Sequence, residues 1–392
     1  MTHLEILRYL NKTFSANFYL VGGFVRDMLL GKPSFDYDIA TDMLPETIIK
    51  VAKTKGLRTI PTGLKHGTVT LIINSNHLEI TTFRRDFNNN GRHSNVEFTK
   101  SIHEDSKRRD FTINAIYLDE HNNLYDFHNS QNDLQKQVIR FIGDPKERIK
   151  EDYLRILRFF RFLSITETDK SKDSLTKEII SIFEKETVNL SILSRERISQ
   201  EFIKICDKDH FIRSFLGMLK VKNLQTYFNL SENIKIFKDK DFSLIKHWDS
   251  FDKLCLIFSF NLEDILQQNN FRWSNKQKSK VKTHIKALKS DILSDGFVKN
   301  IFIYGKQSME FVIIQKYFAD ELSKNIVISK LEELNNIIIP EVPVTAKDLI
   351  SLGFKKNKEL GIVLKKVETF WIDNNFTSKK LCLDFARKLL KK

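Results

Sequence analysis

The stretch LVGGFVRDMLLGKPSFDYDIAT, residues 20–41, decides how the front of this chain folds. It begins as an apolar strand and passes through a glycine pair into a helical stretch that ends at Gly31. It then continues into a second strand-like segment that carries Asp36 and Asp38. Residues two apart on a strand point to the same face, so this pattern places the two carboxylates side by side. Because carboxylates that are buried without a partner are costly, the sequence predicts a bound cation here.

The ligand types and the neighbouring residues favour Mg²⁺ and a phosphate. Mg²⁺ prefers oxygen ligands, keeps several waters and takes further ligands from substrate phosphates, and a pair of such ions can clamp both oxygens of a phosphoryl transfer. Gly23 starts a helix after a strand, which suits a phosphate, and Arg26 adds charge-assisted bonds one turn later. Taken singly, a tight glycine turn or two solvated aspartates would explain each feature. Their occurrence together favours a site for a metal and a nucleotide.

Glu79, in HLEITTF (77–83), is the third candidate carboxylate. On a neighbouring strand it would act as a metal ligand or as the base for an attacking hydroxyl. The alternative is an ion pair with Arg84 or Arg85.

The chain changes character near residue 130. Before it, short segments rich in β-branched and aromatic residues predict strands, and the helical stretches 24–31 and 45–56 lie between them. These predicted strands are 18–23, 35–41, 67–73, 77–83 and 114–119. The polar segment 87–95 predicts a loop. After it, apolar residues recur at helical spacing, with a linker at Pro340 and Pro343.

Composition limits the class of protein. A chain of 392 residues predicts two to four domains. No apolar run is long enough to span a membrane and the N-terminus lacks a signal sequence, so we expect a cytosolic protein without a membrane partner. The three cysteines lack metal-ligand spacing and are interpreted as separate thiols. The net charge of +14 favours a polyanionic partner.

A second cluster of chemistry lies in EDYLRILRFFRF, residues 151–162. Asp152, Arg155, Arg158 and Arg161 recur every three residues, which on one helix predicts a shared face. A salt-bridged helix is one interpretation. The density of arginines beside apolar residues favours instead the oxygens of a triphosphate.

Several motifs resemble one family in order and spacing. They are residues 20–41, RRDFTINAI (108–116), GDPKERIKEDYLRILRFFRF (143–162), SRERISQE (194–201) and TAKDLISLGFKKNKELGIVLKKVETFWIDNNF (345–376). Together they resemble the class II tRNA nucleotidyltransferase and poly(A) polymerase family over nearly the whole chain. The resemblance is greatest to the bacterial CCA-adding type. The middle of the chain, about 205–340, carries none of these motifs and is recognisable only as helical.

The resemblance implies an α+β fold with a polymerase-β-like nucleotidyltransferase head, which holds a small mixed sheet, followed by an all-helical remainder. The implied parts are a head (1–135), a neck with the nucleotide-selecting motif (136–210), a body (211–335) and a basic tail that binds tRNA (336–392). The implied activity is Mg²⁺-dependent addition of cytidine, cytidine and adenosine to the 3′ end of tRNA from CTP and ATP, without a nucleic-acid template. No obligate protein partner is evident.

The resemblance also assigns residues. Asp152 and Arg155 match the pair that reads the base. Arg109, Arg158 and Arg161 match residues that support nucleotide binding, and Asp110 would orient Arg109. In SRERISQE, Glu196 and Glu201 resemble residues that brace the neck helix.

The chemistry of the bases agrees with a carboxylate and a guanidinium as the selecting pair. Cytosine and adenine each carry an exocyclic amino donor beside a ring-nitrogen acceptor, so Asp152 would accept and Arg155 would donate. Guanine and uracil place a carbonyl oxygen opposite the carboxylate. Leaving buried polar groups unpaired gives steep discrimination, on the order of 10⁴-fold.

The C-terminal end is the most basic part of the chain. Residues 351–392 hold eleven Lys or Arg and four Asp or Glu. Seven of these lysines are candidates for contact with the tRNA backbone, namely Lys355, Lys356, Lys358, Lys365, Lys366, Lys379 and Lys380. A solvated helix face is the plainer interpretation.

Four alternatives remain. A poly(A) polymerase shares the head motifs but does not retain this tail pattern. A CC-adding enzyme lacks the flexible loop after the first motif, whereas TTFRRDFNNNGRHSNVEF (81–98) is full length. An A-adding enzyme is not separable by sequence. A non-catalytic tRNA-binding protein would not need Asp36, Asp38 and Arg26 together.

Overall fold

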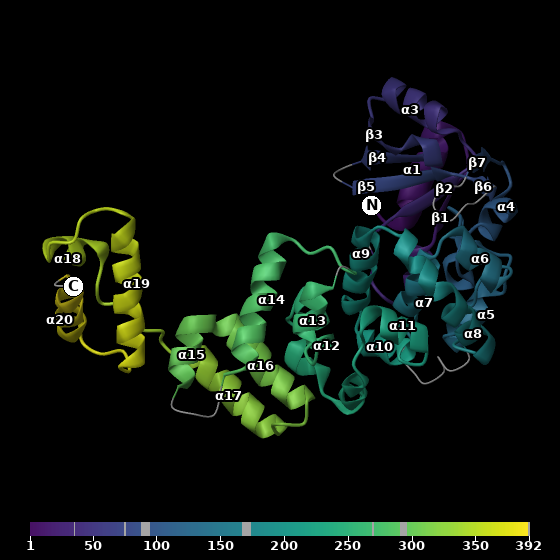
Figure 1. The fold of residues 1–392 in the computed structure, drawn as a ribbon. Coiled ribbons are helices and arrows are strands. Elements are labelled where there is room, and N and C mark those ends of the chain that lie inside the picture. Colours follow the sequence, from purple (N-terminus) through teal and green to yellow (C-terminus); the bar gives the residue numbers. More distant parts are fainter. Residues whose placement is uncertain are drawn as a thin grey trace. The chain divides into compact units, whose positions relative to one another are not determined.

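The computed structural model describes every residue except 35, 74–75, 88–94, 167–173, 269, 291–295 and 391–392. The chain forms two compact units (Figure 1). Unit 1 holds Met1–Lys238, Asp249–Ile257 and Gln268–Arg272, and unit 2 holds Asp239–Trp248, Phe258–Gln267 and Trp273–Lys392. The finer division into head, neck, body and tail stays a prediction.

Unit 1 is built on a seven-stranded mixed sheet. In spatial order its strands are β3 (Arg58–Gly63), β4 (Thr68–Ile73), β5 (Asn76–Thr82), β2 (Asp38–Thr41), β1 (Phe18–Val21), β8 (Ile116–Leu118) and β9 (Leu124–Asp126). Only β2 and β5 pair in parallel, with Asp38 opposite Glu79, and the other neighbours are antiparallel. The predicted α+β fold with a mixed N-terminal sheet is confirmed. The strands β3 and β9 were not predicted.

A two-stranded ribbon accompanies the sheet. It consists of β6 (Arg84–Phe87) and β7 (Asn95–Phe98), paired antiparallel. The loop predicted at 87–95 falls mostly on residues 88–94, outside the described residues. Its two ends are strand residues, because Phe87 pairs with Asn95.

Five helices accompany the sheet, namely α1 (His3–Phe14), α2 (Gly23–Leu29), α3 (Pro45–Thr54), α4 (Ile102–Lys107) and α5 (Ser130–Lys136). The helix α2 follows β1 through Gly22, whose φ of 74° is accessible to glycine without strain. A Cβ at Gly22 would lie 3.3 Å from Oδ2 of Asp38. The glycine therefore lets the backbone approach the aspartate closely.

Among its described residues, the regular elements in the rest of unit 1 are helices, as predicted. Its helices are α6 (Pro145–Glu151), α7 (Leu154–Leu163), α8 (Lys177–Glu186), α9 (Arg195–Cys206), α10 (Phe211–Met218), α11 (Lys222–Phe228) and α12 (Ser250–Ile257). They enclose an aromatic core in which Phe159, Phe160 and Phe183 are fully buried and their rings contact one another. These phenylalanines are therefore core residues rather than platforms for a base.

The prediction that Asp152 shares one helix with Arg155, Arg158 and Arg161 is wrong. The helix α6 ends at Glu151, Asp152 is extended, and α7 begins at Leu154. The physical reason is that Oδ1 of Asp152 accepts the backbone N–H of Leu154 at 3.1 Å. Aspartate competes in this way for backbone donors and so favours helix starts over helix interiors.

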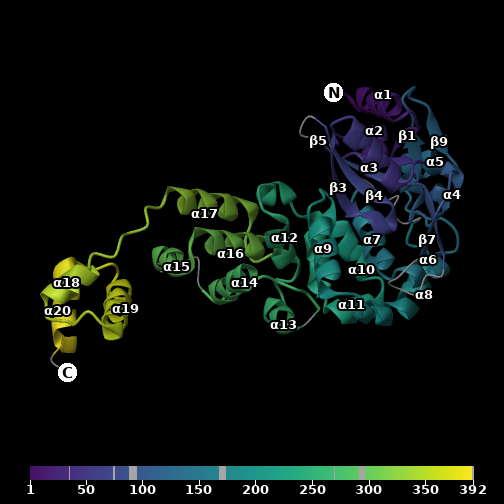
Figure 2. The ribbon, with the colours of Figure 1, turned by 90° about the horizontal axis from the view of Figure 1, so that it is seen from above.

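Within the described residues, the regular elements of unit 2 are all helices (Figure 2). Its α-helices are α13 (Leu262–Gln267), α14 (Asn275–Leu288), α15 (Phe297–Tyr304), α16 (Lys306–Phe318), α17 (Lys324–Asn336), α18 (Ala346–Ser351), α19 (Lys358–Asp373) and α20 (Lys379–Leu390). No helix or strand covers 337–345, where the linker was predicted. The last three helices share a small core around Val367, Trp371 and Cys382.

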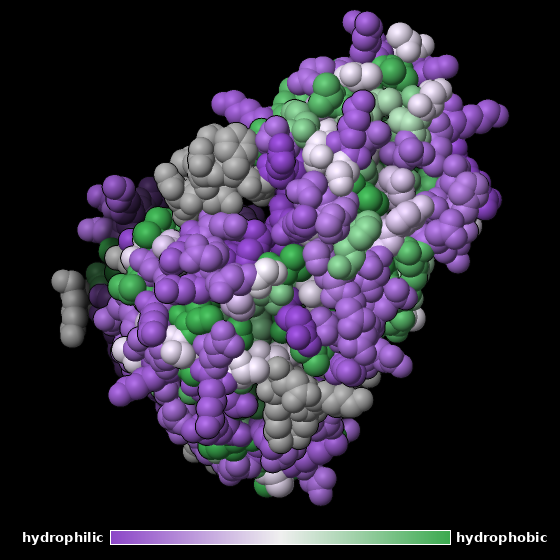
Figure 3. Space-filling model, turned by 90° about the vertical axis from the view of Figure 1, so that its right-hand side faces the viewer, coloured by the Kyte–Doolittle hydropathy of each residue, from purple (hydrophilic) through white to green (hydrophobic). Residues whose placement is uncertain are grey.

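None of the described helices is long and apolar enough to cross a membrane. Figure 3 shows that hydrophilic side chains cover most of one face of the molecule, and that the hydrophobic ones there lie scattered in small groups. Such scattered apolar residues are normal for a protein surface.

Candidate active site

A cleft of about 530 Å³ in unit 1 holds most of the predicted site residues. Its charged and glycine lining residues are Gly22, Gly23, Arg26, Asp27, Asp36, Asp38, Arg109, Asp110, Arg158, Arg161, Lys204, Asp207 and Lys208. The fold thus brings together residues from α2, from β2 and the segment before it, from 109–110, and from α7 and α9. Glu79, Asp152 and Arg155 are not among its lining residues.

The two aspartates lie at the start of β2. Asp36 is exposed and precedes the strand, and Asp38 is its first residue. The prediction that both lie on one strand is therefore wrong for Asp36. Glu79 is exposed and lies opposite Asp38 on β5. Burial, together with the charges of Asp36 and Glu79, raises the pKa of Asp38 to about 6.

These carboxylates fit a divalent ion. Burial and the charges of Asp36 and Glu79 raise the pKa of Asp38 more than the nearby Arg109 and Arg26 lower it. The described residues contain no group of three or more His, Cys, Asp or Glu side chains that could enclose a metal ion. A pair of aspartates with open positions suits an ion that keeps waters and binds substrate phosphates.

Arg26 is a buried part of the site. Its Nη1 donates to Oδ1 of Asn114 at 2.8 Å, and its Nε donates to Asp27 at 2.8 Å. Asn114 in turn donates to Oδ1 of Asp110 at 3.2 Å. Asn114 therefore connects α2 to the RRDFTINAI segment.

Arg109 and Asp110 have different partners from those expected. The prediction that Asp110 orients Arg109 is wrong, because Oδ2 of Asp110 accepts from Nε of Arg158 at 2.6 Å. Burial would raise the pKa of Asp110, but Arg158 and further hydrogen bonds bring it down to about 2. Arg109 donates instead to the Tyr117 hydroxyl at 2.9 Å and to Asp105 at 3.3 Å. The i, i+4 spacing of Asp105 and Arg109 was the sequence signal for this pair.

Three guanidinium groups surround one buried ring of α7 in the cleft. Arg26, Arg158 and Arg161 lie 5.4, 5.6 and 4.7 Å from the ring centroid of Phe162. Arg161 also contacts the buried carboxylate Glu201 at 3.3 Å. Burial and the charge of Arg158 lower the pKa of Arg161 to about 10. This concentration of positive charge favours an anionic ligand.

Asp152 and Arg155 lie near each other in sequence but have separate partners. Asp152 accepts from Arg197 of α9 at 2.8 Å. Arg155 pairs with Glu151 and donates to the Arg148 carbonyl at 2.5 Å. The partners Arg197, Glu151 and Arg148 were not predicted. Arg197 lies within SRERISQE, the motif that was expected to brace the neck through Glu196 and Glu201.

Arg148 of α6 contacts the backbone of the RRDFTINAI segment. It is buried, donates to the carbonyl oxygen of Arg109 at 2.8 Å, and also contacts that of Arg108. Arg155 contacts the Arg108 carbonyl at 3.5 Å. The arginines of α6 and α7 thus hold the backbone that carries Arg109.

The seven tail lysines are exposed, but only some of them lie together on one surface. Lys358, Lys365 and Lys366 line one groove of about 790 Å³ on α19, with Ile362 and Phe370. Lys355 and Lys356 lie before α19, and Lys379 and Lys380 begin α20. Lys379 pairs with Asp348 at 2.7 Å, and Lys365 with Glu368 at 2.6 Å.

The comparisons agree with this geometry. Residues 18–140 match the family model described as the poly A polymerase head domain. The mitochondrial CCA tRNA nucleotidyltransferase 1 of Mus musculus is 30% identical over 385 residues, covering 92% of this chain and 84% of the relative. The CCA-adding enzyme of Lactobacillus helveticus is 30% identical over 360 residues, covering 89% of this chain and 87% of the relative. The structure of the Bacillus stearothermophilus CCA-adding enzyme in complex with CTP shares the fold, with a TM-score of 0.77 at 24% identity, over 99% of this chain and 98% of that one.

The fold and the head-domain match define a nucleotidyltransferase. Similarity to bacterial and mitochondrial relatives over most of their length goes further: the chain belongs to the family of CCA tRNA nucleotidyltransferases, the CCA-adding enzymes. Nucleotidyltransferases of this family generally use a divalent metal ion. The family predicted from the sequence motifs is thereby confirmed.

Proposed function

We propose that this protein adds C, C and A in turn to the 3′ end of tRNA from CTP and ATP, without a template and with release of pyrophosphate. The observation that carries the proposal is the convergence of Asp36 and Asp38 with Arg26, Arg109, Arg158 and Arg161 in one cleft. Family membership supports the same reaction. A cytosolic location, as expected from the sequence, is part of the proposal.

Asp36 and Asp38 would hold Mg²⁺, which when bound supplies positive charge for the attacking and leaving oxygens. Glu79, exposed beside Asp38, would accept the proton of the tRNA 3′ hydroxyl. That oxygen attacks the α-phosphorus, and the bond from the α-phosphorus to pyrophosphate breaks. Arg26, Arg158 and Arg161 would bind the triphosphate and stabilise the charge that pyrophosphate carries away.

Asp152 and Arg155 are proposed to select the base. An ionised carboxylate has about four acceptor positions, so Asp152 can accept an amino group while it keeps Arg197. Arg155 would donate to the ring nitrogen beside that amino group. Arg197 is then a positioning residue, because it fixes the carboxylate that meets the base.

Two basic surfaces of unit 2 are proposed to contact the tRNA backbone. One is the set of seven tail lysines. The other is a stripe on α14, which the sequence analysis did not single out. The stripe consists of Lys278, Lys282, Lys286 and Lys289, spaced three or four residues apart and therefore on one face.

Few negative charges lie near the α14 stripe. All four lysines are exposed, and residues 275–289 contain no Asp or Glu. Lys289 lies 3.7 Å from Glu263, and the other three have no ion-pair partner within the described residues. Like charges at this spacing destabilise a helix slightly, which favours a role in binding phosphate groups.

The product made on a tRNA that lacks its 3′ CCA tests the proposal. With CTP and ATP together we expect three added nucleotides, and with CTP alone two. A long adenosine tract would indicate a poly(A) polymerase, and addition of only CC or only A a partial enzyme. Binding of tRNA without any addition would indicate a non-catalytic protein. Removal of residues 345–392 should raise the Michaelis constant for tRNA and reduce its salt dependence.

A further inference from the structure

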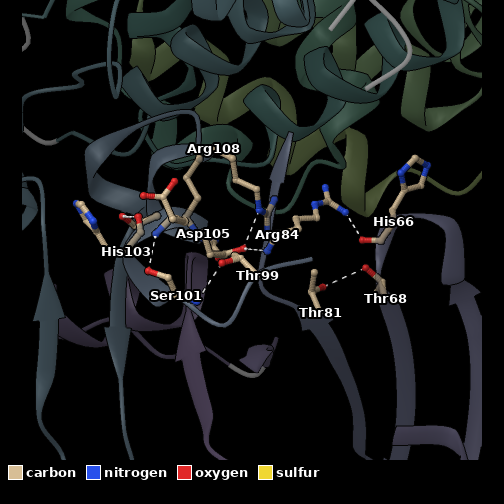
Figure 4. A network of polar contacts seen from close by, with 12 residues as sticks. His66, Thr68, Thr81, Arg84, Thr99, Ser101, His103, Asp105 and Arg108 are labelled. Atoms are coloured by element: carbon tan, nitrogen blue, oxygen red, sulfur yellow. Dashed lines mark hydrogen bonds and ion pairs between the residues drawn. The ribbon is translucent and has the colours of Figure 1, made fainter. Parts of the chain in front are cut away.

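Asp105 of α4 is a fully buried carboxylate that lies behind the cleft. Figure 4 shows the side chain of Arg108 directed toward Asp105, whereas the side chain of Arg84 is directed toward the backbone of His66. The Oδ1 atom accepts the backbone N–H of Arg84 at 3.1 Å and Nε of Arg108 at 2.8 Å. The Oδ2 atom accepts the Tyr117 hydroxyl at 2.7 Å and Nη2 of Arg109 at 3.3 Å. This buried charge is therefore fully hydrogen-bonded, as its burial requires.

The hydrogen bonds of Arg109 hold its guanidinium next to Asp105. Its Nε donates to the Tyr117 hydroxyl at 2.9 Å, and that hydroxyl itself donates to Asp105. Its Nη1 lies 3.5 Å from the carbonyl oxygen of Asn114. These three bonds occupy Nε, Nη1 and Nη2 of Arg109, and its only ion pair within the described residues is the one with Asp105.

Asp38 is nevertheless close. The position that a Cβ at Gly22 would occupy lies 3.3 Å from Oδ2 of Asp38 and 3.8 Å from Nη1 of Arg109. A buried guanidinium that loses its carboxylate is strongly disfavoured and turns to another anion. For Arg109 the nearby anion is Asp38, the residue proposed to bind the metal.

We propose that Asp105, with Tyr117, is a positioning residue that keeps Arg109 off Asp38, so that the Asp38 carboxylate stays open to the divalent ion. The inference rests on the proposed function of Asp36 and Asp38 as metal ligands. Without the negative charge of Asp105, Arg109 moves onto Asp38 and competes with the metal. Groups that position a ligand for a metal typically change its affinity by about 10- to 100-fold.

The test is the affinity of the full chain for Mn²⁺ alone, measured by calorimetric titration without tRNA or nucleotide. Asp105→Asn, which keeps the shape of the side chain, is expected to weaken Mn²⁺ binding by about tenfold or more. Arg109→Ala is expected to bind Mn²⁺ at least as tightly as the unaltered protein. Adding Arg109→Ala to Asp105→Asn should restore binding, because the competing cation is gone.

The double variant separates positioning from mere loss of structure. If Asp105→Asn only loosened the fold, removing Arg109 as well would not restore Mn²⁺ affinity, and the proposal would be wrong. Unchanged affinity in Asp105→Asn would also overturn it. Tyr117→Phe removes one bond to Arg109 and keeps the ring, so it serves as a second variant should Asp105→Asn fold poorly, with a smaller loss expected. If the unaltered protein does not bind Mn²⁺, the proposed metal site fails instead.

Discussion

The cations of the cleft and those of the unit 2 surface differ in how they are held. In the cleft, Arg158 lies 2.6 Å from Asp110 and Arg161 lies 3.3 Å from Glu201, with both carboxylates buried. On α14, by contrast, Lys278 and Lys282 are exposed, without an ion pair within the described residues.

The difference teaches what each region can recognise. Paired and buried groups keep one geometry, so they can distinguish one ligand from another through the cost of unpaired polar groups. Exposed lysines are flexible and screened by salt, so they attract phosphate groups without reading them. We therefore expect large, specific effects from changes in the cleft and small, salt-dependent effects from changes on the surface.

The largest effect is expected for Asp38→Ala. Loss of a metal ligand should lower the rate of nucleotide addition by about 10³-fold or more, while tRNA affinity, measured by filter binding, stays within about twofold because the surface cations are intact. Burial raises the pKa of Asp38 in the metal-free protein, so protons compete with Mg²⁺ there and addition by the unaltered protein should need more Mg²⁺ as the pH falls. Asp42→Asn, outside the cleft lining, is the control. Activity that persists in Asp38→Ala would refute the assignment.

The next effect concerns the choice of base. Asp152→Ala is expected to reduce the preference for CTP and ATP over UTP and GTP by about tenfold or more, because the acceptor for the amino group is gone. The measurement is single-nucleotide incorporation with each of the four nucleotides. Glu147→Gln, an exposed change on α6, should leave the preference unchanged. An unaltered preference in Asp152→Ala would exclude this residue as the selector.

A third effect is on stability. The pKa of Asp110 is about 2 in the folded protein, below the ordinary value of 3.8, so its ionised form stabilises the fold above pH 4 and that contribution is lost as the pH falls toward 2. Asp110→Asn should lower the free energy of unfolding by about 2 kcal/mol at pH 7. In urea titrations the difference should shrink markedly by pH 3. A similar loss in the exposed Asp207→Asn would show that the Arg158 pair is not responsible.

The smallest effect is expected on the surface. Changing Lys278, Lys282 and Lys286 to Gln should weaken tRNA binding several-fold at low salt and reduce the slope of log affinity against log salt, by at most about 0.7–0.9 for each lost contact. The preference among nucleotides should not change. The same number of charges removed at exposed Lys12, Lys53 and Lys136 is the control. Equal losses in both variants would mean that net charge, not the α14 stripe, attracts the tRNA.

The sequence predicted the parts of the site that local patterns encode. The glycine pair, Asp38 and the strands around them follow from periodicity and turn residues, and they lie where predicted. The ion-pair partners of the arginines could not be predicted from local patterns. Asp110 was assigned to its neighbour Arg109, but side chains of consecutive residues diverge, and only the packing of α7 brings Arg158 to Asp110.

The same limit applies to Asp152 and its helix. The charges do recur every three residues, but Asp152 is extended and its side chain accepts the backbone N–H of Leu154, so the helix is interrupted there. Its partner Arg197 lies 45 residues away in sequence, so no local pattern joins them. Contacts between distant segments depend on the tertiary core, which periodicity alone does not specify.

The central claim is that Asp36 and Asp38 perform the chemistry while Asp152 and Arg155 choose the base. Its most direct test is the equilibrium binding of CTP, ATP, UTP and GTP, in the presence of Mg²⁺, to Asp38→Ala and to Asp152→Ala. We expect Asp38→Ala to retain a preference for CTP and ATP, and Asp152→Ala to bind all four with similar affinity. Retention of the preference in Asp152→Ala, or its loss in Asp38→Ala, would contradict this separation of roles.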